Sequence, residues 1–175
     1  MRGFLRRFAA DRRGTAAIEL AGVGSLLIVG ALNVADVGRY AYQSSEVNAA
    51  AQAGAEAAIT TCDLNQIPAT VSCQGLNSAV TSAIQSTRLG AQVTLNGAIT
   101  EGYYCLTNAN TLGLAGSASN PPANCSGVPN ATGSAQPTLY LQVRVTYPFQ
   151  PLFPGLTLAQ AFPSAVARTA WMRMS

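Results

Sequence analysis

The sequence predicts an α+β protein. We expect a long N-terminal helix whose first half spans a membrane, then a small, loop-rich domain with an antiparallel β-sheet and two disulfides. Three observations favour this fold: an apolar stretch begins at Thr15, four cysteines all follow it, and alternation of apolar and polar residues is clearest near the C-terminus. Charged residues make up only 10% of the chain, well below the roughly one quarter found in soluble domains.

The predicted membrane span covers residues 15–35, which read TAAIELAGVGSLLIVGALNVA. A helix of this length is about 31 Å long, enough to cross the hydrocarbon core of a bilayer. Glu19 and Asn33 are its only strongly polar residues. Three glycines suit close approach to another membrane helix better than they suit a helix in water, so we expect helix packing at Gly22, Gly24 and Gly30.

The helical pattern continues beyond the span. Small and apolar residues from Val37 to Ala58 fall at steps of three and four, and no proline occurs before Pro68, so one helix from about 15 to 60 is expected. Its outer half would pack on its own domain or on another subunit. The expected divisions are a basic leader (1–14), the membrane helix (15–35), its continuation (36–60) and an outer α+β domain (61–175).

The outer domain has weaker signals. We expect a loop over 62–73, a helix over 76–87 with Asn77 as a candidate N-cap and Gly90 as a candidate stop, and a strand around 93–95. Residues 107–137 have the composition of a long surface loop. The clearest strand covers 139–147, and a last strand is predicted over 164–174.

Arginine supplies all ten basic residues, and the chain has neither lysine nor histidine. Five arginines precede the span, at Arg2, Arg6, Arg7, Arg12 and Arg13. A basic flank stays in the cytoplasm, which predicts a cytoplasmic N-terminus and an outer domain on the far side of the membrane. These arginines could instead bind anionic lipid or nucleic acid, but we expect no nucleic-acid partner.

The missing residue types also argue against catalysis. A P-loop needs lysine, and most nucleophilic triads and catalytic zinc sites use histidine. After residue 60 the only acidic residues are Asp63 and Glu101, and nothing in the sequence shows that they meet. We therefore expect no enzyme activity, no cofactor and no metal.

The four cysteines favour two disulfides in an oxidising compartment. They are Cys62, Cys73, Cys105 and Cys125. Three connectivities are open, of which we favour the local one, Cys62 with Cys73 and Cys105 with Cys125, because short loops close most readily.

The start of the span carries a processing signal. An ordinary secretory signal is cleaved after its apolar stretch at a small-residue site, and no clear site of that kind is present. Instead, Gly14 lies directly before the apolar stretch, and Glu19 lies within the stretch, five residues after Gly14. This arrangement resembles the processing site of type IV prepilins. The resemblance implies that a prepilin peptidase cuts between Gly14 and Thr15 and leaves the helix intact.

More of the chain resembles the TadE-like proteins of tight-adherence (Flp, type IVc) pilus assembly. The similar segments are Gly14–Glu19 (GTAAIE), Asp36–Tyr40 (DVGRY), Ala49–Ala55 (AAAQAGA), Thr146–Pro154 (TYPFQPLFP) and Ala165–Arg168 (AVAR). In this family an aromatic residue often follows the glutamate, where this chain has Leu20. The resemblance is good over 1–60 and loose over 138–175.

This resemblance implies a pilin-like outer domain and a pseudopilin or minor pilin-like role. Other pilin or pseudopilin subunits would be its partners, and the inner membrane its location, with the C-terminal domain in the periplasm or in a surface pilus. A carboxylate inside an apolar helix is costly unless it is paired. Cleavage would place a new α-amine at Thr15, on the same helix face as Glu19. We expect Glu19 to pair with that amine during assembly, although simple hydration near the lipid headgroups is the alternative.

Two other functions remain open from the sequence. One is a single-pass envelope binding module with no pilus role, in which Glu19 would be dispensable. The other is a secreted protein that has lost residues 15–35 by ordinary signal cleavage.

Overall fold

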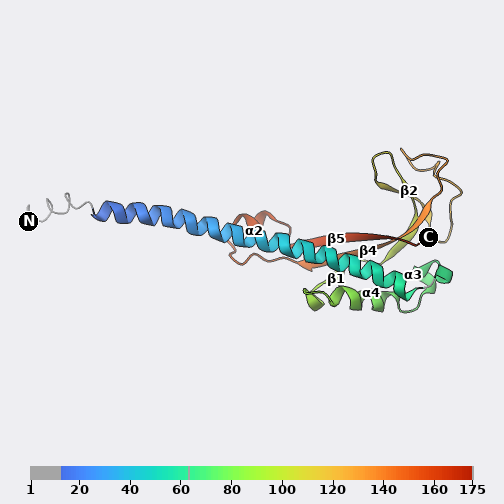
Figure 1. Ribbon diagram of the computed structural model, residues 1–175, viewed down its shortest axis with the longest axis horizontal. Coiled ribbons are helices and arrows are strands. Elements are labelled where there is room, and N and C mark those ends of the chain that lie inside the picture. The colour runs from blue at the N-terminus through green and yellow to red at the C-terminus, as the bar shows by residue number, and fades with distance from the viewer. Residues whose placement is uncertain (1–12, 63, 175) are drawn as a thin grey trace, which may run out of the picture. The chain divides into compact units, whose positions relative to one another are not determined.

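The computed structural model describes residues 13–62 and 64–174. Its first element is a single helix, α2 (Arg13–Thr61), which confirms the helix predicted over 15–60 (Figure 1). The α+β prediction, with a long apolar helix, an antiparallel sheet and two disulfides, is also confirmed. The chain divides into two compact units, one made of Met1–Ala41 with Gln150–Pro163 and the other of Tyr42–Phe149 with Ser164–Ser175.

The second unit contains a five-stranded antiparallel sheet. Its strands are β1 (Thr94–Leu95), β2 (Thr100–Leu106), β3 (Leu112–Ser117), β4 (Thr138–Pro148) and β5 (Ala165–Arg173). The long strand β4 is central: β5 pairs along one edge, with Val143 opposite Ala170, while β1 and β2 share the other edge. β3 extends the sheet beyond β2.

Short helices make up the rest of the second unit. They are η1 (Leu64–Gln66), α3 (Ala69–Ser72), α4 (Leu76–Gln85) and η2 (Gly90–Gln92). The remaining short helix, η3 (Leu158–Ala161), belongs to the first unit.

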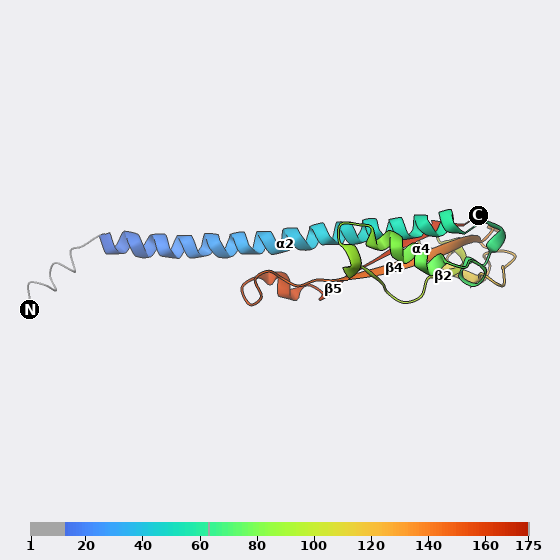
Figure 2. The same cartoon turned by 90° about the horizontal axis from the view of Figure 1, so that it is seen from below.

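The core of the second unit lies between one face of β4 and two helices. Alternate residues of β4 are buried because successive side chains of a strand point to opposite faces, and this buried set is Leu139, Leu141, Val143, Val145 and Tyr147. Small residues of α2 allow close packing here. A Cβ added at Gly54 would lie 2.7 Å from Ile84 Cγ2 and 3.3 Å from Val143 Cγ1. Figure 2 shows α4 alongside this part of α2.

The outer half of α2 therefore packs on its own domain. Val47, Ala51 and Ala58, all on the predicted helix face, are fully buried, whereas Val37 of the same pattern is 42% exposed. Of the two packing partners that the sequence left open for this half of the helix, the structure shows contacts with its own chain.

Several local predictions were wrong. The N-cap of α4 is Gly75 in the left-handed conformation (φ +94°), and Asn77 lies inside the helix. The helix ends at Gln85, before Gly90, which instead begins η2. The predicted 107–137 loop contains strand β3, and the predictions lacked β2 altogether. Both strands contain glycine and lack strict alternation, so their pairing with each other and with β4 was not visible locally.

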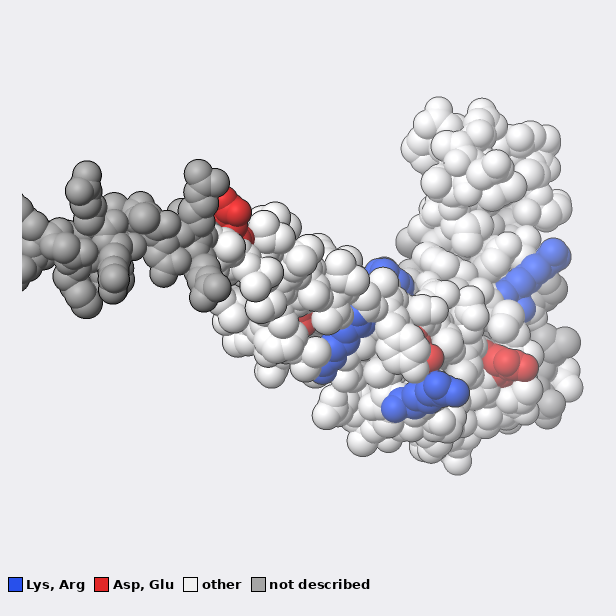
Figure 3. Space-filling model, turned by 60° about the vertical axis from the view of Figure 1, so that its left-hand side comes forward, with Lys and Arg blue, Asp and Glu red and all other residues white. Residues whose placement is uncertain are grey.

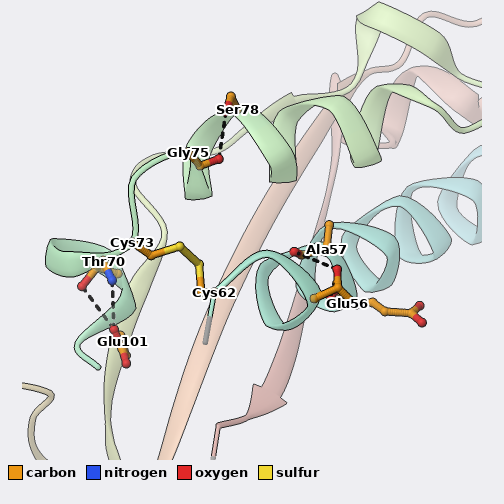
Figure 4. Close-up of a disulfide and its surroundings, with 9 residues drawn as sticks. Glu56, Ala57, Cys62, Thr70, Cys73, Gly75, Ser78 and Glu101 are labelled. Carbon is orange, nitrogen blue, oxygen red and sulfur yellow. Dashed lines mark hydrogen bonds between the residues drawn. A yellow bond between two sulfur atoms is a disulfide. The ribbon is translucent and has the colours of Figure 1, made fainter. Parts of the chain in front are cut away.

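The structure has the local disulfide connectivity. Cys62 bonds to Cys73 and Cys105 to Cys125. The first bond ties the end of α2 to the segment after α3 (Figure 4). Beside it, the Glu101 carboxylate on β2 accepts hydrogen bonds from the backbone N–H and the hydroxyl of Thr70. The second bond forms a small core with Val128.

Candidate membrane-anchoring and assembly site

The first half of α2 has an apolar and almost fully exposed surface. Its large apolar side chains keep between 42% and 75% of their exposure; they are Ile18, Leu20, Val23, Leu26, Leu27, Ile28, Val29, Val34 and Val37. Within the described residues, this is the one helix whose length and composition would let it cross a membrane. No residue of the most apolar stretch of this helix is buried inside the protein. A helix that is apolar all round needs either a core or lipid around it, and the described residues supply no core there.

The predicted processing site lies at the edge of the described residues. Gly14 and Glu19 are exposed on the first turns of α2, Thr15 is helical, and residues 1–12 of the leader lie outside the described residues. The Glu19 carboxylate makes no hydrogen bond or ion pair with any other described residue. Its partner, if it has one, must therefore come from outside the described part of this chain.

No described part of the chain packs against the three glycines of the span from outside the helix. Apart from the backbone of the helix itself, a Cβ added at Gly22, Gly24 or Gly30 would meet no atom within 4 Å. At 3.6 residues per turn, Gly22 and Gly30 lie within about 60° of Glu19 around the helix axis, whereas Gly24 lies about 140° away. The glycines therefore face two different sides of the helix.

Just beyond the span, Asp36 is a fully buried carboxylate. Its Oδ1 accepts a hydrogen bond from the Leu152 N–H (2.8 Å), and its Oδ2 accepts bonds from the Thr157 hydroxyl (2.7 Å) and the Phe153 N–H (3.4 Å). Burial alone would raise the pKa of this carboxyl. The hydrogen bonds outweigh it, first that of Thr157 and then those of the two amides, and the pKa of Asp36 is lowered from its ordinary value of 3.8.

Neighbouring residues of α2 hold the same segment. The Asn33 Oδ1 accepts a hydrogen bond from the Leu158 N–H at 2.8 Å, while its Nδ2 donates to the Val29 carbonyl. Arg39 donates to the Gln150 carbonyl at 3.2 Å. The rings of Tyr40 and Phe162 lie 4.6 Å apart, centre to centre. Residues 33–40 of α2 thus bind the Gln150–Pro163 segment, which we call the docked loop.

The sequence reasoning assigned no role to Asp36 and did not predict the docked loop. One signal was available: an acidic residue directly follows a 21-residue apolar span, and residues 150–163 contain no charge. A buried carboxylate needs hydrogen-bond donors, and a segment fixed by prolines with free amides can supply them. The position of those donors, more than 110 residues along the chain, is not encoded locally.

The sheet unit has a separate concavity of ≈ 610 Å³. Its lining includes Thr100, Tyr104, Gln142 and Arg144. The Thr100 hydroxyl donates to the Gln142 amide oxygen at 3.0 Å. The lining also includes Glu101, so this surface offers hydrogen bonds and one charge of each sign to a ligand or another protein. Figure 3 shows one face of the molecule, on which charged side chains are few and scattered.

No group of three or more acidic, cysteine or histidine side chains is placed to hold a metal ion among the residues that the structure describes. Glu101 has one carboxylate oxygen, Oε1, that is buried without a hydrogen bond. Asp63, the other acidic residue after position 60, lies outside the described residues.

Comparison with known proteins gives one match. The family model described as TadE-like protein matches residues 14–56. The matched segment begins at the glycine of the predicted processing site and includes the exposed apolar helix, Glu19 and Asp36. No curated protein and no solved structure matches the chain significantly.

Proposed function

We propose that this chain, a TadE-like protein through residues 14–56, is a pseudopilin or minor pilin-like component of the tight-adherence (type IVc, Flp) pilus. It is anchored in the inner membrane by the first half of α2, with its N-terminus in the cytoplasm and its C-terminal domain in the periplasm. It acts by assembly with other pilin or pseudopilin subunits and turns over no substrate. The outer domain supplies contacts for pilus initiation, assembly or adhesion.

The observation that carries this proposal is the unsatisfied surface of the first half of α2. Its apolar side chains are exposed all round, which suits lipid, but Glu19 and the glycines do not suit lipid alone. A charged group at membrane depth needs a partner, and an exposed glycine in a helix interior costs about 1 kcal/mol relative to alanine. Neighbouring helices would satisfy both requirements.

Processing by a prepilin peptidase fits this surface. Cleavage between Gly14 and Thr15 would remove the leader and leave a positively charged amine four residues from Glu19. Positions four residues apart are neighbours on one helix face. The amine of one subunit could then neutralise Glu19 of its own helix or of the next subunit.

The first test is N-terminal mass spectrometry of membrane fractions. Cells with an active prepilin peptidase should yield a chain that begins at Thr15, and cells lacking the peptidase should yield the full leader. A Gly14→Val variant should keep the leader in both strains. Recovery of a chain that begins at Met1 from peptidase-positive cells would rule out processing.

The second test separates pilus assembly from a simple anchored module. Glu19→Gln should reduce co-purification with pilin-like subunits and lower pilus number. The matched control is Glu56→Gln, which alters an exposed glutamate of the same helix. If Glu19→Gln behaves like this control and no pilin-like protein co-purifies with the native chain, the chain is an anchored envelope module with no role in pilus assembly.

A further inference from the structure

The docked loop, residues 150–163, presents an apolar surface of its own. Leu152, Leu156 and Leu158 are 54%, 60% and 76% exposed. Thr157, between the last two leucines, and Ala159, just after them, are buried. The Thr157 hydroxyl and three backbone amides of the loop bond to α2, while the three leucine side chains stay exposed.

The same loop has no charged residue whose hydration would favour water over lipid. Residues 150–163 contain no Asp, Glu, Lys or Arg. The nearest carboxylate, Asp36, is buried and receives three hydrogen bonds from the loop. The nearest cation, Arg39, bonds to the Gln150 carbonyl. An arginine at this position suits lipid phosphate, because its apolar stem and charged head match the membrane interface.

Contacts with α2 set the depth of the loop. The Leu158 N–H bonds to Asn33, which lies two residues before the end of the 15–35 span. Arg39 is six residues further on, or about 9 Å along the helix. The exposed leucines are therefore attached to the helix where the hydrocarbon core gives way to the headgroups. Their surface continues the exposed apolar surface of α2 within a single compact unit.

We infer that the docked loop inserts Leu152, Leu156 and Leu158 into the lipid interface of the outer leaflet of the membrane that α2 spans. The inference rests on the membrane anchoring in the proposed function. The loop then acts as a second anchor beside the helix. It also covers the Asp36 carboxylate, so this charge can lie next to lipid without facing it.

Tryptophan fluorescence in vesicles tests this inference, because Trp171 is the only tryptophan of the chain. A Trp171→Phe background would receive one new tryptophan at a time, through Leu156→Trp or Leu158→Trp in the loop. Leu26→Trp in the span reports anchoring itself. Leu114→Trp, at a leucine of β3 that is 63% exposed, controls for any attraction of an added indole to lipid.

The full-length variants would be reconstituted in phosphatidylethanolamine–phosphatidylglycerol vesicles containing lipids brominated either near the headgroup or near the acyl terminus. The expected result is strong quenching of the two loop variants by shallow bromine and weaker quenching by deep bromine. Leu26→Trp should respond most to deep bromine, and Leu114→Trp to neither.

Each other outcome is decisive. Quenching of Leu26→Trp without quenching of the loop variants overturns the inference and leaves the anchoring intact. No quenching at any position means that α2 does not span the bilayer, and the anchoring and the inference both fail. Blue-shifted loop emission that depends on the protein-to-lipid ratio, but not on bromine, assigns the leucines to a second copy of the chain and also overturns the inference.

Discussion

The carboxylate of Asp36 and the hydroxyl of Thr157, 121 residues apart in the chain, lie 2.7 Å from each other. This bond joins a helix position just outside the predicted membrane span to a loop that interrupts the sheet unit in sequence. Both side chains are buried, so the bond cannot simply be exchanged for water. Among the α2 residues that hold the docked loop, Asp36 is the buried one.

Loss of the Thr157 hydroxyl should release the loop. Thr157→Val keeps the side-chain shape but removes a donor to a buried carboxylate, which is costly because the acceptor cannot regain water. We expect faster proteolysis within 150–163 of the detergent-solubilised protein. Thr169→Val, at an exposed threonine of β5, is the matched control and should leave the cleavage rate unchanged. Equal rates in both variants would mean that the bond does not hold the loop.

Loop docking should weaken in acid. The pKa of Asp36 is lowered in the folded protein from an ordinary value of 3.8. The ionised carboxylate therefore contributes stability that is complete above about pH 3.8 and is lost as the pH falls through the lower folded value. Hydrogen exchange at the Leu152 amide should rise in that window. Asp36→Asn should show weaker protection at neutral pH and lose this acid dependence; an unchanged profile would contradict the assignment.

Bulky substitutions should distinguish the sides of the membrane helix. Gly22→Leu and Gly30→Leu alter the side that carries Glu19, whereas Gly24→Leu alters a side about 140° away. Among the described residues, a Cβ added at any of the three meets no atom within 4 Å outside the helix's own backbone, so the fold should tolerate all of them. If one helix partner binds the Glu19 side, only the first two should reduce crosslinking to pilin-like subunits. Equal losses in all three would indicate neighbours on both sides, and no loss in any would contradict helix packing.

Gly54 should tolerate substitution least among the helix glycines. Even a single added Cβ would come within 2.7 Å of Ile84 and 3.2 Å of Val80, and overpacking of this kind typically costs about 1–3 kcal/mol. Gly54→Leu should lower the free energy of unfolding by at least this amount, measured by urea denaturation in detergent. Gly38→Leu, where the added group meets nothing within 4 Å, should show no comparable loss.

The two disulfides should differ in what they hold. Replacing either pair of cysteines with alanine should lower the free energy of unfolding by about 2–5 kcal/mol. The pair with a separation of 20 residues should cost about 0.5 kcal/mol more than the pair with 11, from loop closure alone. Loss of Cys105–Cys125 should also expose the small core around Val128 and speed proteolysis within 107–137, whereas loss of Cys62–Cys73 should not. Thermal unfolding and peptide mapping measure both effects.

The predictions that succeeded from sequence rest on local periodicity. Helix α2 could be predicted because its apolar and small residues recur at helical spacing without a proline, and β4 because its residues alternate strictly. The predictions that failed depend on distant partners. The glycines in β2 and β3 weaken any local strand pattern. The backbone hydrogen bonds of these strands are satisfied by the pairing of β2 with β4 and of β3 with β2.

By itself, the sequence determined the elements whose pattern is carried by neighbouring residues: the long helix with its apolar first half, the glycine and glutamate at its start, the central strand and the disulfide-bonded outer domain. Only the tertiary structure decided where Asp36 finds its hydrogen-bond donors, and therefore that residues 150–163 lie against α2. The physical reason is that a buried charge constrains only the chemistry of its partners. It does not say which segment of the chain supplies those partners. Here the segment is the one that connects β4 to β5.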